Sequence, residues 1–381
     1  MFKRITALTV CALMIAGCAA STPAAPSSSE SSAAAGQPQY TYKDPAPDMV
    51  LATAPGGDIT YKDYRLYIDV SESIARHNAR QNAAIVAVLE HDLEKMGVNI
   101  DEQAISAQAD SNLEIMRSYF NDFDGELAQL ADIAGLTVDQ TLAAIKFGFR
   151  SDHLIEQMGA AIEAEAAEEY APLAIQPSES GDPAVDPELI KQQGIYDLAA
   201  RKMEQYSKTM DSRLSFDNEN VLVTLDGEDI ALYEEASAFI EYSAAAARFD
   251  TVSFIQQGEL MLNALEQKGI ELDVDSINAE HDAYISNIKS TPEQLQKLTE
   301  LCSPFGATAD DYFEGLRRPL LIETATNRYY EVIDEEYAKL LEDNTNNSGE
   351  LAADIPTPDQ YYVEGMNALM KSSELVNISG K

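Results

Sequence analysis

The 381-residue sequence is poor in the side chains that most often form cross-links. It contains three cysteines, and two of them, Cys11 and Cys18, lie in the N-terminal targeting segment. Cys302 alone remains for the folded chain, which excludes a disulfide framework and a cysteine-based zinc site. Because Cys302 follows an apolar helical stretch, we expect it to be a small buried hydrophobic residue rather than a nucleophile.

Histidine is also scarce, and its spacing does not suggest a metal site. The four histidines include no His-x-x-x-His pair: His77, His91, His153 and His281. The acidic stretches at 122–126, 163–169 and 334–336 lack the alternating ligands and the Gly and Glu positions of an EF-hand loop. We therefore expect these stretches to be solvated surface, and we expect no metal ion or other cofactor.

Positive charge is the third shortage. The chain has 26 Lys and Arg against 65 Asp and Glu, for a formal net charge of -39. Such a chain repels nucleic acids, so DNA or RNA is excluded as a partner. The sequence also lacks a Gly-x-Ser-x-Gly elbow, a Walker loop and a dinucleotide-binding glycine motif. We accordingly predict no catalytic residues and no enzyme activity.

The N-terminus resembles that of a bacterial lipoprotein. Residues 1–17 combine Lys3 and Arg4 with a short apolar run, which is typical of a signal peptide and too short for a membrane span. Ile15-Ala16-Gly17-Cys18 resembles a lipobox, in which Cys18 is acylated and becomes the new N-terminus. Residues 18–40 are rich in Ser, Ala and Pro, which predicts a disordered tether. We expect a protein anchored by lipid to the extracytoplasmic face of the cell membrane.

The remainder of the sequence repeats itself. Residues 52–59 match 223–230, and residues 135–140 match 306–311, a spacing of 171 in both cases (223 minus 52, and 306 minus 135). This spacing is far longer than the ~20–50 residues of solenoid repeats, so we infer duplication of a whole domain. The predicted domains are 49–216 and 221–378, hereafter the first and second repeats.

Each repeat is predicted to be mainly helical. Strands are expected at 49–53 and 221–225, followed by helices in the same order in both repeats. Thr60 is the expected N-cap of the first helix, and Gly97 and Gly269 mark helix ends. The fifth helix is expected to begin at Thr137 or Thr308 and to run to about Tyr170 or Leu341.

The end of each repeat shows a second common pattern. A disordered-looking insert, 172–186 or 342–358, precedes a further helix, at about 188–210 or 360–370. Short alternating segments then follow at 213–216 and 375–378. We predict that each pairs with the opening strand of its own repeat, so that a small β-strand pair joins the two ends of the domain.

This ordered set of features resembles the N-terminal chaperone domain of the SurA-like and PrsA-like extracytoplasmic foldases. The resemblance rests on the turn before Ile59 and Ile230 and on the Gly-Leu-Thr cap at Gly135, matched by Gly306-Ala307-Thr308. It covers 49–216 and 221–378 and implies two tandem chaperone domains. The family's parvulin prolyl-isomerase motifs, a His-Ile-Leu strand start and a Gly-Gly-Asp-Leu-Gly loop, are absent, which implies a chaperone without isomerase activity.

The resemblance implies a membrane-anchored holdase that binds unfolded exported polypeptides. The alternative is a scaffolding lipoprotein that binds one defined partner in the cell envelope. The client-binding residues are not assigned by the sequence. Apolar side chains that could contribute, although core packing is the commoner role at helical spacing, are Tyr119, Phe120, Phe123, Phe147, Phe149 and the methionines at 96, 116, 158, 203 and 210.

Overall fold

The computed structural model describes most of the chain from residue 48 onward. The described residues are 48–54, 57–119, 122–170, 187–214, 221–225, 227–348, 356–358, 360–361 and 365. The signal peptide 1–17, Cys18 and its tether 18–40, the insert 172–186 and the segment 375–378 lie outside these residues. Our expectations for them therefore stay predictions.

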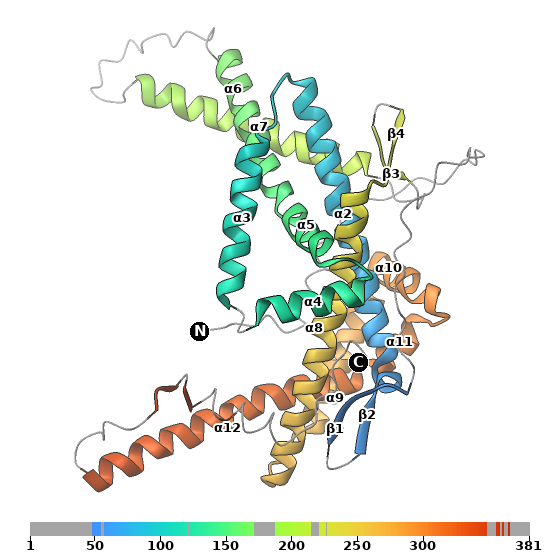
Figure 1. Cartoon of the computed structure of the whole chain (residues 1–381), viewed down its shortest axis with the longest axis vertical. Coiled ribbons are helices and arrows are strands. Elements are labelled where there is room, and N and C mark those ends of the chain that lie inside the picture. Colours follow the sequence, from blue (N-terminus) through green and yellow to red (C-terminus); the bar gives the residue numbers. More distant parts are fainter. Residues whose placement is uncertain are drawn as a thin grey trace. The chain divides into compact units, whose positions relative to one another are not determined.

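The described chain is mainly helical and carries two small antiparallel hairpins (Figure 1). The elements of the first repeat are β1 Val50–Ala54, β2 Gly57–Thr60, α2 Tyr61–Lys95, α3 Glu102–Tyr119, α4 Phe123–Ala134, α5 Val138–Gly148, α6 Arg150–Tyr170 and α7 Pro187–Arg213. The elements of the second repeat are β3 Val221–Leu225, β4 Glu228–Ala231, α8 Glu234–Gln267, α9 Val274–Lys289, α10 Pro292–Cys302, η1 Ser303–Phe305, α11 Ala309–Gly315 and α12 Arg317–Ser348. None of the described helices has the length and apolar character needed to cross a bilayer.

The predicted helix boundaries of the two repeats are confirmed where caps define them. Thr137 and Thr308 both form reciprocal capping boxes, with Gln140 and Asp311 respectively. Gly97 and Gly269 end α2 and α8 with φ values of 72° and 71°. This left-handed conformation carries a steric penalty for residues with a Cβ, and glycine avoids it.

The strand pairs differ from the prediction. β1 pairs with β2 and β3 with β4, so each opening strand folds back on the residues that directly follow it. The segment expected at 213–216 does not begin as a strand, because Arg213 is the last residue of α7. Pairing a strand with the segment that directly follows it is local and costs less chain entropy than pairing the two ends of a repeat.

Two helices also differ from the prediction. The expected fifth helix is interrupted in both repeats, at Phe149 between α5 and α6 and at Leu316 between α11 and α12. In the second repeat Pro319 lacks the N–H that would bond to the carbonyl of Gly315, so the first helix ends there. The predicted disordered insert 342–358 is helical over its first part, because α12 continues to Ser348.

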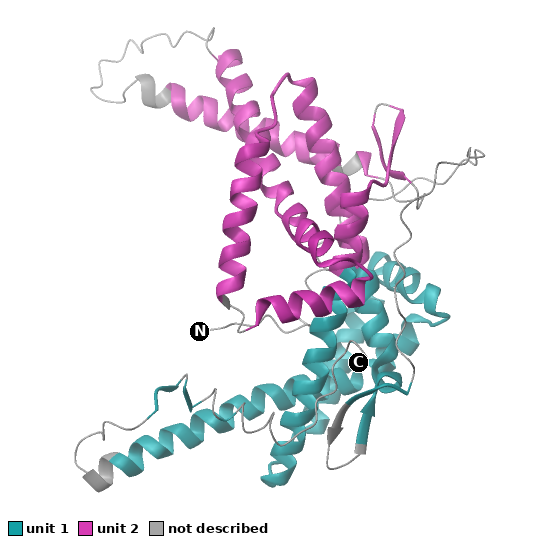
Figure 2. Cartoon of the chain, viewed as in Figure 1, with its two compact units in different colours: residues 1–20, 42–75, 244–381 teal, residues 21–41, 76–243 magenta. Residues whose placement is uncertain are grey.

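The chain forms two compact units, and each unit takes segments from both repeats (Figure 2). Among the described residues, unit 1 contains 48–75 and 244–365, and unit 2 contains 76–243. These units do not coincide with the predicted ranges 49–216 and 221–378. In each unit an opening hairpin and the first part of a long helix come from one repeat, and most of the remaining helices come from the other.

Two apolar cores correspond to the two units. In unit 1, the buried residues Leu51, Tyr67 and Ile68 of the first repeat pack in one core with Ile255 and Met261 of the second. In unit 2, Leu222 and Val223 of the second repeat pack in one core with Leu89, Leu154 and Met158 of the first. Neither core is built from a single repeat.

Replacing an interior helical glycine by alanine is expected to have opposite effects on stability at two positions of this chain. A Cβ at Gly258 in α8 would lie 2.9 Å from Cβ of Ile322, which is fully buried, whereas a Cβ at Gly159 in α6 would meet nothing within 4 Å. We expect Gly159→Ala to stabilise the fold by about 0.5–1 kcal/mol, because alanine favours the helix. We expect Gly258→Ala to destabilise the fold by about 1 kcal/mol, because overpacking outweighs that gain. Urea unfolding followed by circular dichroism measures both, and stabilisation by both variants would contradict the packing of α8 on α12.

Candidate functional site

A small apolar cluster in unit 2, separate from its main core, is the candidate binding surface. We call it the α3–α5 cluster. It has three buried members, Leu113, Leu127 and Ile145. The partly buried side chains packed against them are Met116, Phe123, Leu142, Phe149 and Tyr242. Each of these five side chains is partly exposed, so the cluster presents some apolar surface to solvent.

Helical spacing brings these side chains to one place. Leu113 and Met116 are three residues apart on α3, and Phe123 and Leu127 are four apart on α4. Such pairs lie on the same face of a helix. The start of α4 is fixed by Asp122, whose carboxylate accepts a hydrogen bond of 3.0 Å from the amide of Gly125.

The third helix of the cluster follows the same rule. Leu142 and Ile145 are three residues apart on α5, and Phe149 caps its C-terminus. The capping box at Thr137 fixes the start of α5, and Gly135, with φ 69°, ends α4 just before it. Because both α3 and α4 pack against α5, this helix holds the cluster together.

Charged side chains of both signs surround the cluster. The guanidinium of Arg117 lies over the ring of Phe123, 5.2 Å from its centroid, and is 3.9 Å from a carboxylate oxygen of Asp124. Lys146 on α5 forms an ion pair of 2.6 Å with Asp110 on α3. This arrangement suits reversible contact with an apolar segment that carries charges of its own.

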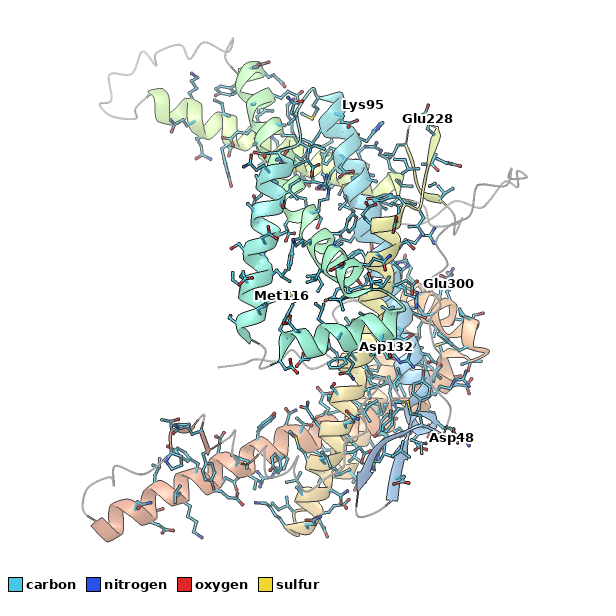
Figure 3. All side chains as sticks on the ribbon, in the orientation of Figure 1. Asp48, Lys95, Met116, Asp132, Glu228 and Glu300 are labelled. Carbon is cyan, nitrogen blue, oxygen red and sulfur yellow. The ribbon has the colours of Figure 1, made fainter. Side chains whose placement is uncertain are left out.

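The apolar residues suggested by the sequence have different fates. Met116, Phe123 and Phe149 meet in the α3–α5 cluster, and Figure 3 marks Met116 on α3. Phe147 and Met158 are buried in the main core of unit 2, and Met203 and Met210 pack against that core. Met96 is 41% exposed at the end of α2. The side chains of Tyr119 and Phe120 lie outside the described residues.

Sequence reasoning missed two of the partly buried members of the cluster, Leu142 and Tyr242. Leu142 had a detectable signal, because it precedes Ile145 and Phe149 at spacings of three and seven along one helix face. No local pattern in the sequence indicates that Tyr242 belongs to the cluster, because it lies in the second repeat and packs against helices of the first.

A second group of interest is a buried carboxylate in unit 1. Glu259 of α8 is only 3% exposed. It accepts two hydrogen bonds of 2.6 Å from Nε and one terminal nitrogen of Arg318, and a third from the hydroxyl of Tyr64. Burial, followed by the negative charge of Glu259, raises the pKa of the Tyr64 hydroxyl. The phenol therefore stays protonated and donates to the carboxylate.

Unit 2 contains a corresponding trio. Arg150 donates from Nε to Glu90 over 2.6 Å and binds Glu102 with both terminal nitrogens, over 2.5 and 2.7 Å. Burial raises the pKa of the Tyr233 hydroxyl, and the charge of Glu90 adds to this effect. Within the described part of the chain, the Tyr233 hydroxyl is buried without a hydrogen-bond partner.

The two trios have the same residue types, at spacings two or three residues short of the 171 that separates the repeats, and both cross the repeats. Tyr64 and Tyr233 are 169 residues apart, as are Glu90 and Glu259, and Arg150 precedes Arg318 by 168. In each trio the tyrosine comes from one repeat and the Glu–Arg pair from the other. Glu259 is occupied by three donors, which suits a group that positions the opening segment.

The histidine and acidic residues described next make hydrogen bonds and ion pairs within the fold. His281 is buried, and its Nε2 lies 2.7 Å from the carbonyl oxygen of Phe313. Glu165 and Glu169 both pair with Lys202, and these two carboxylates are largely exposed, as predicted. Over the residues that the structure describes, no group of three or more His, Cys, Asp or Glu side chains is arranged to hold a metal ion.

The paired tyrosines provide a matched test of the two trios. We expect Tyr64→Phe to lower the free energy of unfolding by about 1–2 kcal/mol, because Glu259 loses a donor in a buried place. We expect Tyr233→Phe to change it by less than about 0.5 kcal/mol, because that hydroxyl makes no hydrogen bond. Chemical denaturation of both variants measures the difference, and equal losses would contradict the assigned role of Tyr64.

Cys302 provides a test of burial. Its side chain is fully buried in unit 1, and desolvation, with a smaller contribution from Asp311, raises the pKa of the thiol to about 11. At about pH 8 we expect alkylation of the folded chain lacking residues 1–39 to be ~100-fold slower than that of a free thiol. Unfolding in guanidinium should restore full reactivity. Rapid labelling of the native chain by iodoacetamide would contradict this assignment.

Comparison with protein-family models, with curated proteins and with solved structures gave no match for this chain. The candidate surface and the trios therefore stand on their own geometry.

Proposed function

We propose that this protein is a lipid-anchored extracytoplasmic holdase that binds unfolded exported polypeptides and has no prolyl-isomerase activity. The observation that carries the proposal is the α3–α5 cluster, where aromatic and methionine side chains stay half-buried outside the main core of unit 2. Side chains of these types adapt to varied apolar shapes, as binding of many clients requires.

A comparison within the molecule favours this surface as the client-binding site. The equivalent helices of unit 1 are α9, α10 and α11, and their apolar side chains join the main core of that unit. Ile288, Leu298 and Phe313 there are all at most 3% exposed. In unit 2 the corresponding helices contribute Ile105 and Phe147 to the main core and also form the separate, smaller α3–α5 cluster. The separate cluster of unit 2 supports the assignment of client binding to these helices.

Charge and attachment are consistent with the same role. A formal net charge of -39 keeps a protein with client attached from associating with others of its kind, and it favours basic clients. A tether of residues 18–40 on an acylated Cys18 would keep the folded part within roughly 70 Å of the membrane. Exported chains emerge at that surface.

Suppression of aggregation tests the proposal directly. A chemically denatured client is diluted into buffer with and without residues 40–381, and light scattering is recorded. We expect suppression at near-stoichiometric amounts. We expect Met116→Ser combined with Phe123→Ser to require about tenfold more protein for the same effect, because burying each side chain contributes roughly 1.5–3 kcal/mol and only part of that area is in contact.

Met96→Ser is the matched control, because Met96 is exposed at the end of α2 and outside the α3–α5 cluster. It should suppress aggregation as the unmodified protein does. Full activity of the double variant would place client binding elsewhere. No suppression with several unrelated clients would reject the holdase, and the capture of a single stoichiometric envelope protein would instead support the scaffolding lipoprotein.

A further inference from the structure

The opening segments of the two repeats are exchanged. The first opening segment comprises β1, β2 and residues 61–75 of α2, and it belongs to unit 1 with residues 244–365 of the second repeat. The second comprises β3, β4 and residues 234–243 of α8, and it belongs to unit 2 with residues 76–214 of the first repeat (Figure 2). Each opening segment therefore completes the helices of the other repeat.

The apolar contacts of the exchange are extensive. Six buried core residues of unit 1 come from α2: Tyr61, Tyr64, Tyr67, Ile68, Val70 and Ile74. In unit 2, Leu222, Val223, Leu225 and Ala236 of the second repeat are at most 2% exposed within a core otherwise supplied by the first. Burial of each large side chain contributes roughly 1.5–3 kcal/mol, so removal of an opening segment would expose a large apolar surface on the other repeat.

In both units a side chain of one long helix also donates a hydrogen bond to the opening strand of the other repeat. In unit 1, Gln256 of α8 donates a hydrogen bond of 2.5 Å to the backbone carbonyl of Leu51 in β1. In unit 2, Arg80 of α2 donates one of 2.8 Å to the backbone carbonyl of Val221 in β3. Each long helix thus holds the opening strand of the other repeat by its backbone, which fixes position without requiring a particular strand side chain.

The tyrosine of each trio lies in the exchanged segment or directly beside it. Tyr64 lies in the first opening segment and donates to Glu259, whose other donor, Arg318, is in the second repeat. Tyr233 immediately precedes α8 and lies beside Glu90 and Arg150 of the first repeat. A buried carboxylate that requires a donor from the other repeat disfavours any arrangement in which that repeat is missing.

We propose that each repeat carries an interaction surface for another copy of the repeat. The two repeats, which are connected in the chain by residues 215–220, would then associate through non-covalent contacts even without that connection. The surface lies on the helices that follow each opening segment, and its ligand is the hairpin and the first turns of the long helix of another repeat. The covalent link raises the effective concentration of the partner and is not needed for the fold. The proposal is independent of the holdase.

Cutting the link in the folded chain tests the proposal. A recognition sequence for a site-specific protease is inserted between Asn218 and Glu219, and the full chain is purified and then cut. We expect the two fragments to elute together from size exclusion as a 1:1 complex with an unchanged circular dichroism spectrum. Elution as separate fragments, or precipitation after cutting, would overturn the proposal.

The trios give the cut complex a second readout. Labelled first-repeat fragment is added in excess, and the rate of its exchange into the complex is measured. We expect Tyr64→Phe to raise the dissociation rate about tenfold, because it removes the donor that crosses to Glu259, and Tyr233→Phe to change it less than twofold. Similar rates for the two variants would show that the Tyr64–Glu259 contact does not hold the repeats together, and would remove the polar part of the proposal.

Discussion

Each apolar core of this chain depends on a hairpin and a half-helix that belong to the other repeat. Neither opening segment is expected to be stable alone, because an isolated two-stranded hairpin is only marginally stable in water. Leu51 and Leu222 are almost completely buried, and both lie in opening strands whose cores are otherwise built largely of helices from the other repeat. The hydrophobic energy of folding is therefore gained jointly by the two repeats.

Polar groups specify this arrangement more than they stabilise it. Taking Glu259 out of water costs several kcal/mol, and the bonds from Arg318 and Tyr64 offset that cost without a large surplus. What they add is selectivity, because a second repeat without Tyr64 would bury a carboxylate that is short of a donor. In the trio of unit 2, the Tyr233 hydroxyl has no hydrogen-bond partner among the described residues, and Arg150 also binds the exposed Glu102, so this trio contributes less to the placement of its opening segment than the trio of unit 1 does.

Local signals in the sequence predicted the elements, and tertiary packing decided the rest. Thr137, Thr308, Gly97 and Gly269 were readable because caps and left-handed glycines act within one helix turn. The exchange of opening segments could not be predicted from the sequence. The repeat shows that two segments are alike, but it does not show which copy packs on which. Each opening strand pairs with the residues that directly follow it, and Arg213 is helical, so the alternation at 213–216 does not begin a strand. The segment 375–378 lies outside the described residues, and its pairing stays a prediction. Part of the candidate surface could be predicted from the sequence: Met116, Phe123 and Phe149 were suggested by their residue types. Tyr242 could not be predicted, because it belongs to the other repeat.

The division of labour within the fold follows from these constraints. The opening segments, the long helices α2 and α8 and the helices α6 and α12 carry the exchange, so their apolar faces are committed to the two cores. Helices α3, α4 and α5 lie in the sequence between two committed elements of the first repeat, and six of their apolar side chains belong to a cluster separate from the main core: Leu113, Met116, Phe123, Leu127, Leu142 and Ile145. In the second repeat, apolar side chains of the matching helices belong to the main core. Phe313, whose carbonyl oxygen contacts the ring of His281, is almost completely buried. Duplication thus gave one copy in which this group of helices joins the main core and one in which part of it forms a separate cluster.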